Sequence, residues 1–115
     1  MQKNNGIRSF ISTAAITRGL RVKLSGSEVV VTGLTEEGIG VTVEGASAGS
    51  PVAVELDNQT VECVAGEALA IGAAVYPAAL GKVADTVSGV RIGIAITAAD
   101  ADGDFIEVLI KPLGA

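Results

Sequence analysis

Hydrophobic and polar residues alternate in several short stretches of the chain, and this pattern predicts β-strands. Residues 20–24 read Leu-Arg-Val-Lys-Leu, which is the alternation of a half-buried strand. Ser25-Gly26-Ser27 follows as a turn, and residues 28–32, Glu-Val-Val-Val-Thr, would close a β-hairpin. No stretch shows a convincing helical period, so the pattern favours a chain built almost wholly from strands.

The pattern occurs twice, because two parts of the chain match at a nearly constant offset. Gly19 and Gly72 are 53 positions apart, and the blocks around them align without a gap. The same offset pairs Ile16 with Leu69, Val22 with Val75, Ile39 with Ile92, Gly40 with Gly93, Val41 with Ile94 and Val43 with Ile96. After one inserted residue, Gly49 matches Gly103, Val52 matches Ile106, Val54 matches Val108 and Leu56 matches Ile110. This indicates an internal duplication, with repeat units at about residues 16–56 and 69–110.

The duplicated pattern predicts an all-β fold, a small barrel or sandwich of about nine short strands. We assign residues 18–115 to a single β domain. Six apolar positions should face its core and should cost the most stability when truncated. They are Val41, Val54, Ile94, Ile96, Ile106 and Val108.

Composition makes this core thin. Hydrophobic residues are 49% of the 115, but the aromatic ones are only Phe10, Tyr76 and Phe105. The many β-branched residues and the 15 glycines suit short strands and tight turns. A core of small side chains often relies on neighbouring subunits for further burial, so we expect self-association.

Charge divides the chain unevenly and predicts an N-terminal arm at residues 1–17. Residues 1–23 carry five bases and no acid, whereas residues 24–115 carry three bases and thirteen acids, so +5 and −10 sum to the net −5. The first 17 residues show no strong period, and we expect them to be mobile alone and ordered against a partner. The expected contact residues of this arm are Lys3, Ile7, Arg8, Phe10, Ile11 and Arg18. The partner would be an acidic protein surface.

The chain lacks the residues that most enzymes and metal sites use. It has no histidine, and its single cysteine, Cys63, lies in an alternating run typical of a buried position. The acidic run at residues 100–104, with Glu107, fails as an EF-hand loop because its glycine and glutamate fall at positions four and eight. We therefore expect no catalytic residues, no cofactor and no metal.

Other partner classes fit poorly. Five dispersed positive charges on an acidic body make a weak nucleic-acid site, and no apolar stretch is long enough to span a membrane. One alternative stays open, a small bacterial β-barrel adaptor that binds a peptide or a carbohydrate. The scarcity of aromatic side chains argues against it, because such sites usually depend on them.

The sequence resembles the capsid cement, or head decoration, proteins of tailed bacteriophages and prophages. Four stretches carry the resemblance: ITRGLRVKL at 16–24, EGIGVTVEGASAGSPVAVEL at 37–56, VECVAGEALAIGAAVY at 61–76 and RIGIAITAADADGDFIEVLI at 91–110. It covers about residues 13–111. The N-terminal arm matches least.

The resemblance implies a structural protein of the virion, made in the host cytoplasm and without catalytic activity. Proteins of this family bind the outer surface of the expanded head, commonly as trimers, and hold neighbouring capsomers together. The implied partners are the major capsid protein and further copies of the chain, in a homotrimer. No nucleic acid and no membrane are implied.

Overall fold

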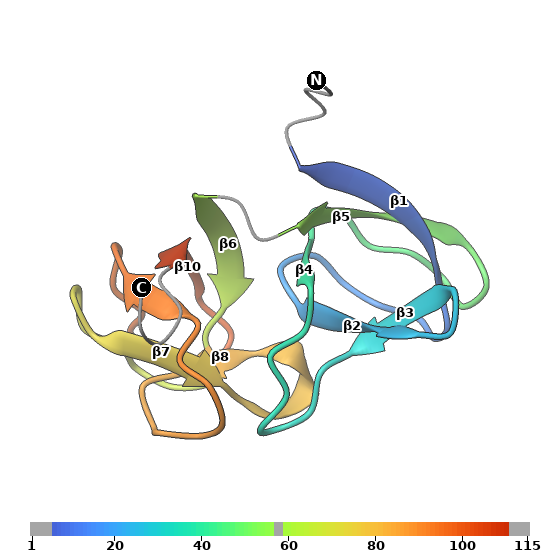
Figure 1. Cartoon of the computed structure of the whole chain (residues 1–115). Helices are drawn as coiled ribbons and strands as arrows, with labels where there is room; N and C mark the ends of the chain where they lie inside the picture. The colour runs from blue at the N-terminus through green and yellow to red at the C-terminus, as the bar shows by residue number, and fades with distance from the viewer. Residues whose placement is uncertain (1–5, 57–58, 111–115) are drawn as a thin grey trace.

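The fold consists of two β units that lie side by side and follow one another along the chain (Figure 1). The computed structural model describes residues 6–56 and 59–110. In the first unit, β1 (Ile7–Ser12), β2 (Arg21–Ser25), β3 (Glu28–Val31), β4 (Gly40–Thr42) and β5 (Pro51–Leu56) form a closed barrel in the order β1-β3-β2-β4-β5. β1 closes this barrel, because it pairs with β5 antiparallel and with β3 parallel.

The second unit repeats this arrangement with a looser closure. β6 (Thr60–Val64), β7 (Ala74–Pro77), β8 (Val83–Ala84), β9 (Gly93–Ala95) and β10 (Phe105–Ile110) form a sheet in the order β6-β10-β9-β7-β8. A 3-10 turn, η1 (Ala79–Gly81), separates β7 from β8. A single parallel bridge between Ala65 and Val83 joins the two ends of the sheet, where the first unit has the β1–β3 pairing.

The strands recur along the chain at the offset on which the sequence prediction of a duplication rests. Each strand of the first unit has a counterpart 53 or 54 positions later, so that β1 corresponds to β6 and β5 corresponds to β10. Connections between strands repeat as well. Ile16 bridges Ala46 in the first unit and Leu69 bridges Ala99 in the second, each through two backbone hydrogen bonds of 2.9–3.0 Å. The all-β prediction is also confirmed, with ten strands against about nine expected.

The core follows the prediction in part. Val41, Val54, Ile106 and Val108 are buried, whereas Ile94 is half-buried and Ile96 is 39% exposed. The expectation that Ile94 and Ile96 point inward is wrong. In β9 the buried residues are Gly93 and Ala95, so the small residues of this strand face the interior and Ile94 lies on the opposite face.

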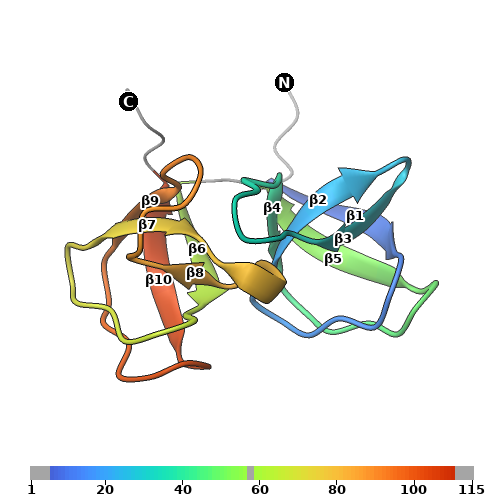
Figure 2. The ribbon, with the colours of Figure 1, turned by 90° about the horizontal axis from the view of Figure 1, so that it is seen from below.

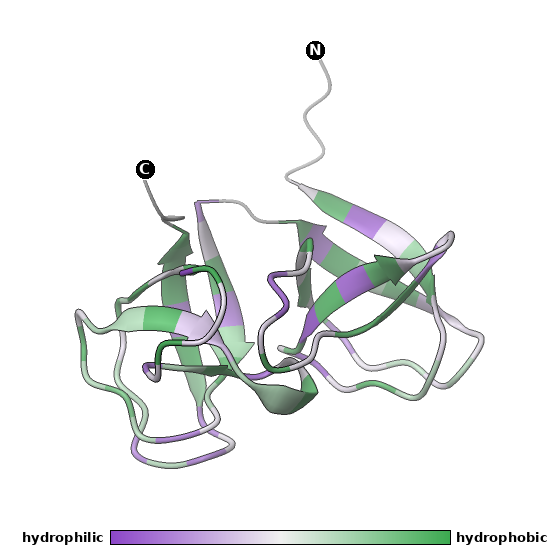
Figure 3. Ribbon diagram, turned by 60° about the horizontal axis from the view of Figure 1, so that its bottom comes forward, coloured by the Kyte–Doolittle hydropathy of each residue, from purple (hydrophilic) through white to green (hydrophobic). Residues whose placement is uncertain are grey.

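Hydrophobic residues follow the strands of both units (Figure 3). They form two buried clusters, one centred on Val22, Val29, Val52 and Val54 and the other on the second unit. Val41 of β4 belongs to the second cluster, although its strand belongs to the first unit. Among the described residues, no helix is long and apolar enough to cross a membrane.

Candidate interaction surface

The predicted N-terminal arm is largely built into the first barrel, which corrects the sequence interpretation. Lys3 lies outside the described residues, and residues 7–12 form β1. Five residues of β1, from Ile7 to Ile11, pair in register with residues 51–55 of β5. This pairing satisfies the backbone hydrogen-bonding groups of β1 within the chain, so no partner protein is needed to order it. The repeat offset is the signal that could have found β1, because β6 displaced by 53 positions falls on it.

β1 has two faces with different roles. Phe10 packs against the core of the first unit and Ser12 is buried. Ile7, Ser9 and Ile11 lie on the opposite face and are exposed. Pro51 and Ala53 of β5 lie beside Ile11 and Ser9 in the register. We call Ile7, Ser9, Ile11, Pro51 and Ala53 the β1–β5 face, and it is bordered by Glu55 opposite Ile7 and by Glu28 opposite Ile11.

Arg8 is a positive charge available to a partner. Its side chain is exposed, and its guanidinium carbon lies 5.6 Å from the centre of the Phe10 ring. Such an exposed cation–π contact is worth about 0.5–1 kcal/mol, which leaves the charge free to pair with a carboxylate. Arg8 has no ion-pair partner among the described residues. By contrast, Lys23 pairs with Glu36, and Lys82 pairs with Asp102 at 2.8 Å.

Arg18 serves a contact inside the chain. It forms an ion pair with Glu62 of β6, and its guanidinium lies over the Phe105 ring of β10 at 4.0 Å from the ring centre. Both partners belong to the second unit, so Arg18 joins the two units. Sequence reasoning placed it in an arm because Glu62 is 44 positions away and only the packing of the units brings them together.

The junction between the two units is close-packed around Gly19. Its carbonyl oxygen accepts a hydrogen bond of 2.9 Å from the backbone N–H of Val64. A Cβ at Gly19 would lie 2.7 Å from the Phe105 ring, so a larger residue does not fit. Arg21 is fully buried nearby, and its guanidinium donates hydrogen bonds of 2.9 and 2.7 Å to the carbonyl oxygen of Glu37.

Three carboxylates have shifted pKa values that reflect local bonding at the surface. The pKa of Glu36 is lowered by its hydrogen bond with Lys23 and by the backbone N–H of Gly33, 2.7 Å away. The pKa of Asp85 is raised because its side chain shares a hydrogen bond with Glu67, and the pKa of Glu67 is lowered by the same bond. These interactions fix the loops that follow β3 and β8.

The described residues offer little chemistry for catalysis or metal binding. Cys63 is buried, and no group of three or more His, Cys, Asp or Glu side chains among residues 6–56 and 59–110 could hold a metal ion. In the acidic run, the Asp104 carboxylate accepts hydrogen bonds from the backbone N–H groups of Asp100 and Ala101, so it caps a turn.

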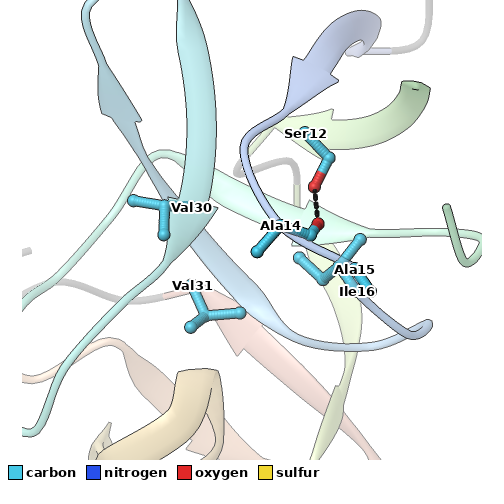
Figure 4. A pocket seen from close by; sticks show the side chains of 6 residues that line it. All are labelled: Ser12, Ala14, Ala15, Ile16, Val30 and Val31. Atoms are coloured by element: carbon cyan, nitrogen blue, oxygen red, sulfur yellow. Dashed lines mark hydrogen bonds between the residues drawn. The ribbon is translucent and has the colours of Figure 1, made fainter. Parts of the chain in front are cut away.

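A shallow hollow lies beside β3 in the first unit (Figure 4). Ser12, Ala14, Ala15, Ile16, Val30 and Val31 line it. Its empty volume is about 200 Å³ including open solvent, and the Ser12 hydroxyl is already bonded to the carbonyl oxygen of Ala14. Small-molecule sites usually occupy about 300–1,000 Å³ and present convergent polar groups. This hollow has neither property.

Comparisons with known proteins point to phage heads. The family model described as phage cement protein matches residues 1–110. Among solved structures, the chain is similar to the N base of the head fiber protein gp8.5 of bacteriophage phi29, with a TM-score of 0.69 at 16% sequence identity. That likeness covers 91% of this chain and 92% of the other, and it concerns the fold. The sequence has no significant match among curated proteins.

Proposed function

Because the chain belongs to the phage cement protein family, we propose that it binds the outer surface of the expanded phage head and bridges neighbouring capsomers. Family membership gives it a structural, non-enzymatic role in a phage capsid, in line with the resemblance that the sequence carries. The proposed partner is the major capsid protein. Contacts that span two capsomers would stabilise the shell, because separating the capsomers would cost the free energy of these contacts.

The observation that carries the capsid contact is the unpaired charge on β1. Arg8 is exposed and has no anionic partner among the described residues, whereas Arg18, Lys23 and Lys82 are each in an ion pair. An acidic site on the capsid would gain a charge-assisted hydrogen bond from Arg8 without breaking a pair inside this chain. We therefore assign the capsid contact to Arg8, with Lys3 and Phe10 beside it in the sequence.

We further propose that the chain acts as a homotrimer. The support is its thin core of small side chains and the exposed Ile7 and Ile11 of the β1–β5 face. Repeated docking on a symmetric shell favours a closed oligomer, because each copy then makes the same contacts. The peptide- or carbohydrate-binding alternative receives no support from the hollow in Figure 4, which is small and lined mainly by aliphatic residues.

Co-sedimentation with undecorated expanded heads tests the capsid contact. Removing residues 1–14 would delete β1 and open the barrel, so a point variant is the better probe. We expect Arg8→Ala to reduce binding by about tenfold at physiological ionic strength, which corresponds to about 1.4 kcal/mol. Ala101→Glu, in an exposed loop of the second unit, makes the same change in net charge and should bind as the wild type does. Equal binding by all three proteins would remove Arg8 from the contact.

A further inference from the structure

The contact that joins the two units within the chain has a defined composition. The first unit contributes Arg18, Gly19 and the outward residue Val41 of β4, which is buried with the second cluster. The second unit contributes Glu62, Val64 and Phe105 from β6 and β10. The contact is head-to-tail, because the β4 side of the first unit meets the β6 side of the second.

Because the units are repeats, the second unit carries residues equivalent to those that the first unit contributes to this contact. Within the described part of the chain, no further unit covers them in the second unit. Val41 corresponds to Ile94, Arg21 to Ala74 and Arg18 to Ile71, each at an offset of 53. Ala74, Ile94 and Leu109 lie in register across β7, β9 and β10 and are half-buried. Ile71 is 69% exposed and precedes Gly72, whose N–H bonds the Ala95 carbonyl oxygen of β9 at 2.7 Å. We call Ile71, Ala74, Ile94, Ile96 and Leu109 the Ile94 face.

A free copy of the second half lies on the first unit. Glu62 corresponds to Ser9 and Val64 to Ile11 at the same offset, and Phe105 corresponds to Pro51 after the inserted residue. These positions belong to the β1–β5 face. Inside the chain the two halves meet through an ion pair, whereas the free halves have Ile71 and Ser9 at the equivalent positions. Both free halves therefore lack the ion pair, and the nearest carboxylates lie at their borders, Glu55 and Glu28 on one and Glu107 on the other.

We infer that the Ile94 face of one chain docks on the β1–β5 face of a second copy, which repeats between chains the contact that joins the units within each chain. The inference rests on the self-association part of the proposed function. The partner that fits the β1–β5 face is a second copy of the chain. Its Ile94 face corresponds in the repeat to the surface of the first unit that covers β6. The two faces lie on different units, β9 in one and β1 in the other (Figure 2). The two faces of one chain therefore cannot contact each other.

The chemistry of this contact differs from that of the internal one. Burial of the apolar residues at the centre of each face would drive it, at about 25 cal/mol per Å² removed from water. A charge introduced into either face would then be desolvated without a partner. Contacts of this head-to-tail kind close into a ring when the rotation between copies permits, and otherwise continue as a filament.

Measurement of molar mass by light scattering across a concentration series tests the inference on the full chain. We expect the wild type to associate, and Ile71→Glu and Ser9→Glu each to raise the dissociation constant at least about tenfold. Leu80→Glu is the matched control, because Leu80 is 68% exposed and belongs to neither face. The double variant Ile71→Arg with Ser9→Glu recreates the Arg18–Glu62 pair between chains and should associate more tightly than Ser9→Glu alone.

A cysteine pair gives a second measurement that does not depend on weakening the contact. In the variant Ile71→Cys with Ser9→Cys, a bifunctional thiol-reactive cross-linker should link different chains, because these positions correspond to Arg18 and Glu62, which meet through long side chains, while Cys63 is buried and should not react. A monomeric wild type, or unchanged association in folded Ile71→Glu and Ser9→Glu together with no cross-linked chains, would overturn the inference. Head binding is measured separately. If the protein is monomeric but still binds heads, only the contact between chains is contradicted. If it associates but binds no heads, only the proposed cement function is contradicted.

Discussion

The carbonyl oxygen of Gly19 accepts a hydrogen bond from the backbone N–H of Val64 at 2.9 Å, and this bond links the first unit to the second. Gly19 precedes β2 and Val64 ends β6, so residues from two copies of a repeat meet at one point. The approach is possible because Gly19 has a positive φ of 83° and no side chain. The close approach of the two units at this point therefore requires a glycine.

Replacing Gly19 by alanine should destabilise the protein by about 2–4 kcal/mol. Part of the loss is the strain of a positive φ, which costs a residue with a Cβ about 1–2 kcal/mol. The rest arises because the new Cβ would lie 2.7 Å from the Phe105 ring and 3.0 Å from Val64. Gly49→Ala is the matched control, since Gly49 has a φ of 78° and nothing within 4 Å of the added Cβ. Urea denaturation of both variants gives the difference, and equal losses would show that the contact with Phe105 is unimportant.

Neutralising Glu36 should lower stability at neutral pH and have little effect in acid. The folded-state pKa of Glu36 lies below its usual value of 4.5, because Lys23 and the N–H of Gly33 favour the carboxylate. A lowered pKa contributes stability above the unfolded value, and this contribution is lost as the pH falls through the folded value. Glu36→Gln keeps an acceptor for Gly33 but removes the ion pair. Thermal unfolding at about pH 7 and about pH 3 should therefore show a difference between variant and wild type only at the higher pH.

High salt supplies the control for this prediction. The Lys23–Glu36 pair is partly exposed, so about 1 M salt should shrink the difference at neutral pH. A difference between wild type and Glu36→Gln that persists unchanged in acid would contradict the assignment of the lowered pKa to this pair.

Truncation of Ile106 and of Ile96 should separate the true core from the predicted one. Ile106 is 1% exposed, and Ile106→Ala should cost about 2–5 kcal/mol through lost burial and the cavity left behind. Ile96 is 39% exposed, and Ile96→Ala should change stability by no more than about 0.5 kcal/mol. Urea denaturation at low protein concentration avoids a contribution from self-association. Similar losses in the two variants would mean that Ile96 is buried in the folded chain.

Much of the fold could be predicted from the sequence because the same strand pattern occurs twice in the chain. Val22 and Val75, or Gly49 and Gly103, occupy matching places in the two units, and a constant offset does not require knowledge of strand order. The face of each strand was harder to predict. Ile94 and its counterpart Val41 both point outward, yet Val41 is buried because the second unit covers it. Alternation reveals which residues share a face, but not what covers that face.

The candidate site was harder to predict because β1 reverses the usual pattern. Ile7 and Ile11 lie on its exposed face, while the polar Ser12 is buried, so the segment looks unpatterned in sequence. Its excess of positive charge then suggested a free arm. The pairing of β1 with β5 depends on residues 40 to 48 positions away, which local patterns do not report. Arg8 alone among the described contact residues keeps the unpaired charge that the arm interpretation required.

Arg18 should prove to be more than an ion-pair partner at the junction of the units. The pair with Glu62 is exposed, so it should contribute only about 0.2–1 kcal/mol, and Glu62→Gln measures that share. The guanidinium plane also lies 4.0 Å from the centre of the Phe105 ring, a contact that a lysine ammonium reproduces poorly. Arg18→Lys keeps the charge opposite Glu62, so a loss of about 0.5–1 kcal/mol in this variant would come from the stacking on Phe105. Arg8→Lys, where Phe10 is 5.6 Å away, should lose less in the same urea titration, and an equal loss in both would argue against a special role for the Arg18 contact.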